Sequence, residues 1–116
     1  MMLRGEVHIV DFGAGQGSEA AKRRPAVIVS NDAANTTAAR LGRGVVTVVP
    51  ITSNVDRVRP FQVRLQAGTA GLQRDSKVQA EQVRSIAVER VGHLLGALPG
   101  AVMRAVDDAL RLHLAL

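Results

Sequence analysis

Short polar clusters in this sequence stand at the ends of apolar runs, where a fold can bring them together. The first is Lys22-Arg23-Arg24, which directly precedes Pro25 and a run of β-branched residues. A guanidinium presents parallel donors that match the oxygens of a phosphate, and it stays charged at ordinary pH. Adjacent cations repel one another, so the cluster indicates a negative partner such as an RNA backbone or an acidic peptide.

Four further clusters carry hydroxyl, amide, carboxylate or guanidinium groups at similar positions. They are Gly17-Ser18-Glu19, Thr52-Ser53-Asn54, Arg74-Asp75-Ser76 and Glu81-Gln82-Val83-Arg84. Strand ends in a small barrel commonly meet at one opening, so these clusters are candidates for a shared site. Each also has an ordinary explanation as a turn, a surface ion pair or a solvated loop, and composition alone favours that explanation.

Several other chemistries find no support in the residues. The histidines at 8, 93 and 113 have no ligand partner three or four positions away, which argues against a metal site. The glycine-rich segment 13–17 lacks the lysine and the Ser/Thr of a nucleotide-binding P-loop. There is no cysteine, so disulfides and thiolate nucleophiles are excluded. The sequence therefore predicts neither a metal nor any other cofactor.

Composition bounds the fold and the partners. The 116 residues suffice for one domain with a single core, which we expect to span residues 1–116. Residues 1–64 hold nine Lys or Arg against five Asp or Glu, within a net charge of +5. Arginine dominates the cations, which favours RNA or an acidic peptide, although a genome rich in G and C also enriches arginine. No signal peptide or membrane-spanning run is evident, so the sequence predicts a cytoplasmic protein without a membrane partner.

Hydrophobic periodicity predicts many short strands and one terminal helix. Apolar runs or alternation predict strands at 5–12, 25–30, 44–50 and 60–65, with one long or two short strands within 76–87. Segments 13–24, 31–44 and 68–75 read as loops or turns. Helical spacing begins after Pro99 and includes Val106, Leu110 and His113. The fold class is therefore α+β, mainly β, with a small barrel capped by a C-terminal helix.

Taken in chain order, these motifs resemble the MazF/PemK family of toxin–antitoxin ribonucleases. The resemblance is carried by the segments 4–7 (RGEV), 10–12 (VDF), 17–19 (GSE), 24–32 (RPAVIVSND), 49–54 (VPITSN), 74–76 (RDS), 81–86 (EQVRSI) and 106–110 (VDDAL). It covers nearly the whole chain. It implies an SH3-like (PemK/CcdB-like) barrel with a C-terminal helix, a homodimer, and metal-independent cleavage of single-stranded RNA at short sequences.

The resemblance also assigns roles to residues. Arg24 and Thr52 match the family's catalytic arginine and threonine. The other residues implied to bind substrate are Ser18, Glu19, Arg23, Ser53, Asn54, Ser76, Glu81 and Gln82. The expected products carry 2′,3′-cyclic phosphate and 5′-hydroxyl ends, and a cognate MazE-like antitoxin with an acidic C-terminal segment is implied as the inhibitor. Whether Arg24 transfers a proton or only stabilises charge stays open at this point, as does the role of Glu19.

Two readings from other classes compete with this one. A gyrase-poison-like toxin of the same fold would act by binding protein, but those relatives carry a C-terminal tryptophan and this chain has none. A basic SH3-like module would bind acidic peptides through the same cations. Aromatic side chains on which bases could stack are scarce, since only Phe12 and Phe61 are aromatic, so RNA recognition would use arginine and polar groups.

Overall fold

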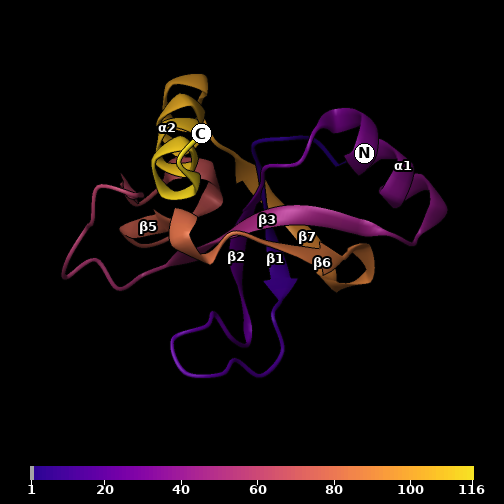
Figure 1. Ribbon diagram of the computed structural model, residues 1–116, viewed down its shortest axis with the longest axis horizontal. Coiled ribbons are helices and arrows are strands. Elements are labelled where there is room, and N and C mark those ends of the chain that lie inside the picture. The colour runs from indigo at the N-terminus through magenta and orange to yellow at the C-terminus, as the bar shows by residue number, and fades with distance from the viewer. Residues whose placement is uncertain (1) are drawn as a thin grey trace.

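A computed structural model describes residues 2–116 of the chain (Figure 1). Its strands are β1 (Glu6–Asp11), β2 (Arg23–Ile28), β3 (Val45–Thr52), β4 (Gln62–Leu65), β5 (Ser76–Gln79), β6 (Arg84–Ala87) and β7 (Val91–Ala97). Its helices are α1 (Asp32–Leu41) and α2 (Gly100–Leu114), with short 3-10 turns at Thr69–Gly71, Ala80–Gln82 and Val88–Arg90. No helix of residues 2–116 is both long and apolar enough to span a membrane.

All strand pairs are antiparallel, and the strand order is β4-β5-β3-β2-β1-β7. The strand β3 organises the sheet, because its first half pairs with β6 and its last two residues pair with β5. The sheet is open, since among the described residues the edge strands β4 and β7 do not pair with each other. The predicted α+β class, mainly β with a C-terminal helix, is confirmed.

The central strands β2 and β3 are covered on both faces. Ala26 and Ile28 of β2 belong to one apolar cluster, together with Val48 of β3 and Ala38 of α1. The alternate residue Val27 belongs to a second cluster, which includes Val106 of α2. Burial on both faces explains why these strands read as continuous apolar runs rather than as alternating ones.

The segment 31–44, expected to be a polar excursion without regular structure, contains the helix α1. The Asn31 side chain caps its first turn by accepting from the Ala34 N–H at 2.8 Å. At the other end, Gly42 has a left-handed φ of 66° and donates to the Ala38 carbonyl. An N-cap asparagine and a glycine after the last turn are common at the two ends of a helix, so the sequence contains signals for α1. The segment has few apolar residues, and it therefore lacks the helical periodicity that would have predicted the helix.

The strand β7 was not predicted. Its pairing with β1 has two register shifts, between Val7 and His8 and between His8 and Val10. Irregular pairing of this kind breaks the alternation by which an edge strand is recognised in sequence. The buried His8 secures the junction, because its ring nitrogens lie 3.0 Å from Glu6 Oε1 and 3.1 Å from the Gly92 carbonyl. This histidine is therefore a structural group between two strands.

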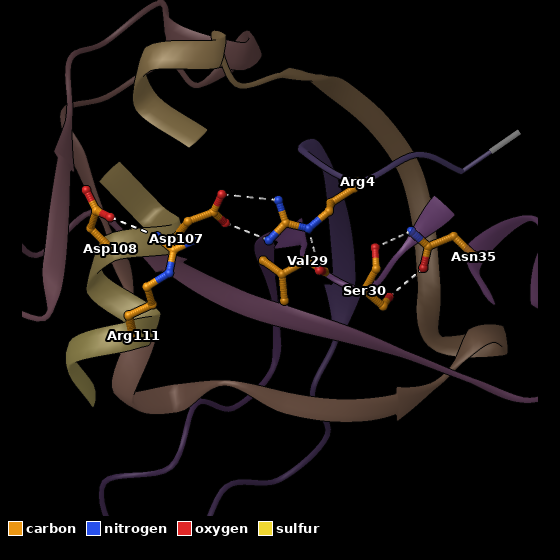
Figure 2. A network of polar contacts seen from close by, with 7 residues as sticks. All are labelled: Arg4, Val29, Ser30, Asn35, Asp107, Asp108 and Arg111. Carbon is orange, nitrogen blue, oxygen red and sulfur yellow. Dashed lines mark hydrogen bonds and ion pairs between the residues drawn. The ribbon is translucent and has the colours of Figure 1, made fainter. Parts of the chain in front are cut away.

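The predicted C-terminal helix is confirmed as α2, with Pro99 as its N-cap residue. Its residues Val106 and Ala109 are buried. His113 is exposed, and its ring lies tilted to that of Phe61 with the two ring centroids 6.1 Å apart. Asp107 lies in the middle of the helix and receives the guanidinium of Arg4, with Nη2 at 2.6 Å from Oδ1. Figure 2 shows that Arg4 also donates from Nε to the Val29 carbonyl, so one side chain ties α2 to the end of β2.

Candidate active site

Strand register brings the two residues matched to catalytic roles together. Ala26 of β2 pairs with Pro50 of β3. The paired stretch ends there, so Arg24 near the start of β2 and Thr52 at the end of β3 lie just beyond it, at neighbouring ends of the two strands.

A cleft of about 590 Å³ opens at this point of the sheet. Its lining includes five residues that the sequence analysis implicated, namely Arg23, Arg24, Thr52, Ser53 and Ser76. Apolar side chains of Ile9, Ile51, Leu72 and Leu95 also line it. The cleft therefore combines a cationic edge, hydroxyl groups and an apolar surface of a size suited to part of an oligonucleotide.

Four cations line the cleft: Lys22, Arg23, Arg24 and Arg74. The ion pairs found in residues 2–116 join other groups, so none of these four is neutralised by a carboxylate within that part of the chain. The lining contains no Asp, Glu or His residue. Unpaired cations around a concave surface concentrate positive potential there, which favours a polyanion.

Arg24 is held more firmly than its neighbours. It is half-buried while Lys22 and Arg23 are exposed, and its Nε donates to the Ala21 carbonyl at 3.0 Å. That bond fixes the plane of the guanidinium and leaves the two terminal amino groups free. A fixed guanidinium with free terminal donors is suited to binding two oxygens of one phosphate.

The loop before Arg24 ends in an unusual backbone conformation. Lys22 has a φ of 65°, in the left-handed region that a residue with a side chain rarely adopts. Its N–H donates to the Gly13 carbonyl at 2.6 Å, and its carbonyl accepts from the Phe12 N–H at 2.8 Å. These bonds close the base of the long segment between β1 and β2, which extends away from the sheet in Figure 1.

The hydroxyl groups of the cleft have local partners. Thr52 ends β3, and its Oγ1 accepts from the Asn54 N–H at 3.2 Å, which leaves the hydroxyl proton available as a donor. Ser76 is buried, and its Oγ donates to the Arg74 carbonyl at 2.9 Å. Thr52 is therefore the hydroxyl better placed to contact a ligand.

The other predicted substrate-binding residues do not line the cleft. Gln82 uses both ends of its amide on the β1–β2 loop, donating to the Ser18 carbonyl and accepting from the Ala20 N–H. Glu81 accepts from the Gln62 amide at 2.6 Å. Glu19 is exposed in the loop, and Asn54 accepts from the Asp56 N–H. In this chain Gln82 and Glu81 hold neighbouring segments in place, and the structure does not bring Ser18, Glu19 or Asn54 to the cleft.

Two kinds of lining residue were not among the predicted site residues. Lys22 and Arg74 belong to the polar clusters of the sequence, and their charge alone would have been a reason to include them among the predicted phosphate-binding residues. Leu95 lies on the unpredicted strand β7, and Leu72 lies in a segment that reads as a turn. No sequence signal places either leucine beside Arg24, because their positions depend on long-range packing.

The arrangement supports phosphate binding and stabilisation of negative charge. The lining offers guanidinium, ammonium and hydroxyl donors, but no carboxylate or imidazole that could serve as a general base. Such a site suits a reaction in which the substrate carries its own nucleophile and the protein orients it and stabilises developing charge.

Comparison with known proteins agrees with a site that binds phosphate groups. The family model described as "PemK-like, MazF-like toxin of type II toxin-antitoxin system" matches residues 3–114. The chain is 59% identical over 116 residues to Endoribonuclease MazF9 of Mycobacterium tuberculosis, covering 100% of this chain and 98% of that protein. It is also 63% identical over 57 residues to Probable endoribonuclease MazF1 of the same organism, covering 49% of this chain and 61% of that protein.

Solved structures share the fold. A mycobacterial endoribonuclease in complex with its cognate antitoxin aligns with a TM-score of 0.78 at 27% identity, covering 100% of this chain and 97% of that chain. MazF from Deinococcus radiodurans aligns with a TM-score of 0.79 at 27% identity, covering 98% and 96%. The match to the family model and the near-complete alignment with MazF9 lead to one assignment: the chain belongs to the PemK-like, MazF-like toxins of type II toxin–antitoxin systems.

Proposed function

We propose that this toxin is an endoribonuclease that cleaves single-stranded RNA in the cleft at the ends of β2 and β3. The observation that carries the proposal is that Arg24 and Thr52 line one cleft among cations that no carboxylate of residues 2–116 neutralises. The full-length relative is named an endoribonuclease, which favours RNA cleavage over the gyrase-poison and peptide-binding alternatives. Cleavage of messenger RNA, or of ribosomal or transfer RNA, in the cytoplasm would inhibit translation and growth.

The chemistry fits a reaction in which RNA attacks itself. The 2′-oxygen forms a bond to the adjacent phosphorus, the bond from phosphorus to the 5′-oxygen breaks, and the products are a 2′,3′-cyclic phosphate and a 5′-hydroxyl. Negative charge accumulates on the non-bridging oxygens during this exchange. The terminal amino groups of Arg24 and the Thr52 hydroxyl donate hydrogen bonds to those oxygens and lower the barrier.

Proton transfer is assigned to solvent in this proposal. A guanidinium remains protonated at ordinary pH, so Arg24 is a poor base and acts through its charge. Because neither a carboxylate nor an imidazole lines the cleft, water accepts the 2′-hydroxyl proton and water supplies a proton to the leaving 5′-oxygen. Arg24 is then a charge-stabilising group.

The reaction should proceed without a metal ion. Self-attack needs neither a metal-bound nucleophile nor a Lewis acid when guanidinium groups stabilise the charge. We expect purified protein to cut a labelled single-stranded RNA at an unchanged rate in excess EDTA, with cyclic-phosphate ends. Loss of cleavage in EDTA with recovery on adding Mg²⁺ would contradict the proposal, and the Arg24→Ala variant controls for contaminating nucleases.

The partners follow from charge and exposed apolar surface. An antitoxin with an acidic segment would compete with RNA for the cleft cations, and an antitoxin complex is recorded for a structural relative. A second copy of the chain would cover exposed leucines such as Leu94, Leu112 and Leu116, which are 53%, 58% and 86% exposed. We therefore include a homodimer and a cognate antitoxin in the proposed function.

Light scattering tests the homodimer directly. The chain has a mass of 12.3 kDa, so a dimer should give about twice that value at micromolar concentration. The mass should be independent of salt, because apolar side chains supply the contact. A salt-independent mass near 12.3 kDa would exclude a stable dimer.

A further inference from the structure

Lys77 occupies the position next to Thr52 across the sheet. It pairs with Thr52 on one side and with Arg64 of β4 on the other. Its neighbour Val78 lies in the apolar cluster beneath α2, and successive side chains of a strand alternate between faces. Lys77 therefore projects to the face opposite that cluster, beside Thr52.

A lysine on that face would ordinarily be solvated, but Lys77 is only 9% exposed. Its Nζ donates to the Arg57 backbone carbonyl at 2.6 Å. Among residues 2–116, Lys77 makes no ion pair with a carboxylate. A buried ammonium is costly unless it is hydrogen-bonded, so the loop carbonyl is the interaction that makes this placement tolerable.

The carbonyl belongs to the loop 53–61, which follows Thr52 and leads to β4. Short-range bonds already shape this loop near its start, where Thr52 Oγ1 accepts from Asn54 and Asn54 Oδ1 accepts from Asp56. Near its end, Gln62 accepts from the Arg59 N–H. Within residues 2–116, the bond from Lys77 is the hydrogen bond that joins the middle of the loop to the sheet.

The loop carries two exposed cations: Arg57, whose own carbonyl Lys77 binds, and Arg59. The loop begins at Ser53, which lines the cleft together with Thr52, so its cations belong to a segment that starts at the edge of the cleft. A loop that is not anchored loses conformational entropy when its cations bind RNA, which weakens binding. A loop that is already anchored in the free protein loses less conformational entropy on binding.

We propose that Lys77 is a positioning residue that anchors the loop 53–61 to the sheet and thereby presents Arg57 and Arg59 to the RNA. This inference rests on the proposed function. Lys77 acts through the loop and touches neither Arg24 nor the reacting phosphate. Thr52 keeps its place without it, because backbone pairing with β5 holds the end of β3. The anchor should therefore govern RNA binding rather than the chemical step.

The test uses the absence of cysteine from this chain. A Lys77→Cys variant has one thiol, which can be alkylated in the unfolded protein before refolding. Alkylation with 2-bromoethylamine creates a side chain of nearly lysine length with its ammonium. Alkylation with 1-bromopropane creates a side chain of the same shape without charge. The pair separates the hydrogen-bonding ammonium from the packing of its stem, and circular dichroism verifies refolding of both.

We expect the aminoethyl form to match the wild type and the propyl form to have a KM for RNA about tenfold higher, the scale of one lost charge-assisted bond. The kcat should stay within about twofold, because the Arg24 and Thr52 geometry is retained. A merely structural defect would reduce the active fraction, which lowers the apparent kcat and leaves KM unchanged. Equal KM values for the two forms would overturn the proposal.

Amide hydrogen exchange gives a readout that needs no RNA. Exchange at residues 54–59 should be about tenfold faster in the propyl form than in the aminoethyl form. Arg57→Ala is the matched control, since it keeps the carbonyl that Lys77 binds and should leave exchange unchanged. Loosening of the loop by Arg57→Ala to the extent seen in the propyl form would overturn the anchor. A wild type that cuts no RNA would instead overturn the proposed function and leave the exchange result standing.

Discussion

Arg24→Ala is expected to lower the single-turnover rate of RNA cleavage by about a thousandfold. The substitution removes the terminal donors that bind two phosphate oxygens, together with the positive charge that stabilises the pentacoordinate phosphorus. The fold should persist, because the side chain is only half-buried and its one hydrogen bond within residues 2–116 is to the Ala21 carbonyl. The measurement is cleavage at saturating protein, paired with circular dichroism of the same sample.

Two neighbours calibrate that result. Thr52→Ala removes one neutral donor from the same cleft, so its expected loss is smaller, about ten- to a hundredfold. Arg23→Ala removes an equal charge from an exposed position, so it should weaken RNA binding and leave the saturated rate nearly unchanged. A folded Arg24→Ala protein that cuts at the wild-type rate would remove Arg24 from the mechanism and refute its match to the family's catalytic arginine.

The sequence was informative wherever burial is uniform along an element. The runs that became β2 and β3 are apolar because both faces are covered, and their polar ends mark the cleft. The clusters around Arg24 and Thr52 meet because β2 and β3 are antiparallel neighbours, so the start of one strand lies beside the end of the other. Local pattern and long-range pairing agree here, so the sequence alone was enough to predict that these two clusters stand at strand ends that share one cleft.

The sequence was uninformative where a residue's role depends on distant partners. Glu81 and Gln82 stand in a polar cluster, which suggested ligand contacts, yet their partners are Gln62 in one direction and the β1–β2 loop in the other. Lys77 reads as an ordinary solvated lysine until the loop 53–61 is seen to cover it. Neither arrangement has a periodic signature, because the partner lies 19 to 64 positions away along the chain.

The segment 31–44 is the clearest example of structure that the sequence did not predict, because both of its asparagines have structural roles. Asn31 caps α1, as described above. Asn35 is fully buried, and Figure 2 shows its amide against Ser30. The amide accepts from Ser30 Oγ at 2.5 Å and donates to the Ser30 carbonyl at 2.8 Å. Ser30 Oγ in turn accepts from the Thr47 N–H of β3 at 3.0 Å. Through Ser30, which follows β2, the Asn35 side chain therefore links α1 to both central strands.

Replacing this amide with an apolar group of similar size should therefore be costly. Asn35→Leu is expected to lower the free energy of unfolding by about 3 kcal/mol, because the Ser30 carbonyl loses its donor and the Ser30 hydroxyl loses its acceptor. Asn31→Ala is the matched control, since it removes an exposed cap of the same helix and should cost about 1 kcal/mol. Both are measured by denaturant unfolding at one fixed protein concentration, which holds any contribution of self-association constant. Equal losses for the two variants would mean that Asn35 contributes only as a helix residue and that the link between α1, β2 and β3 adds no stability.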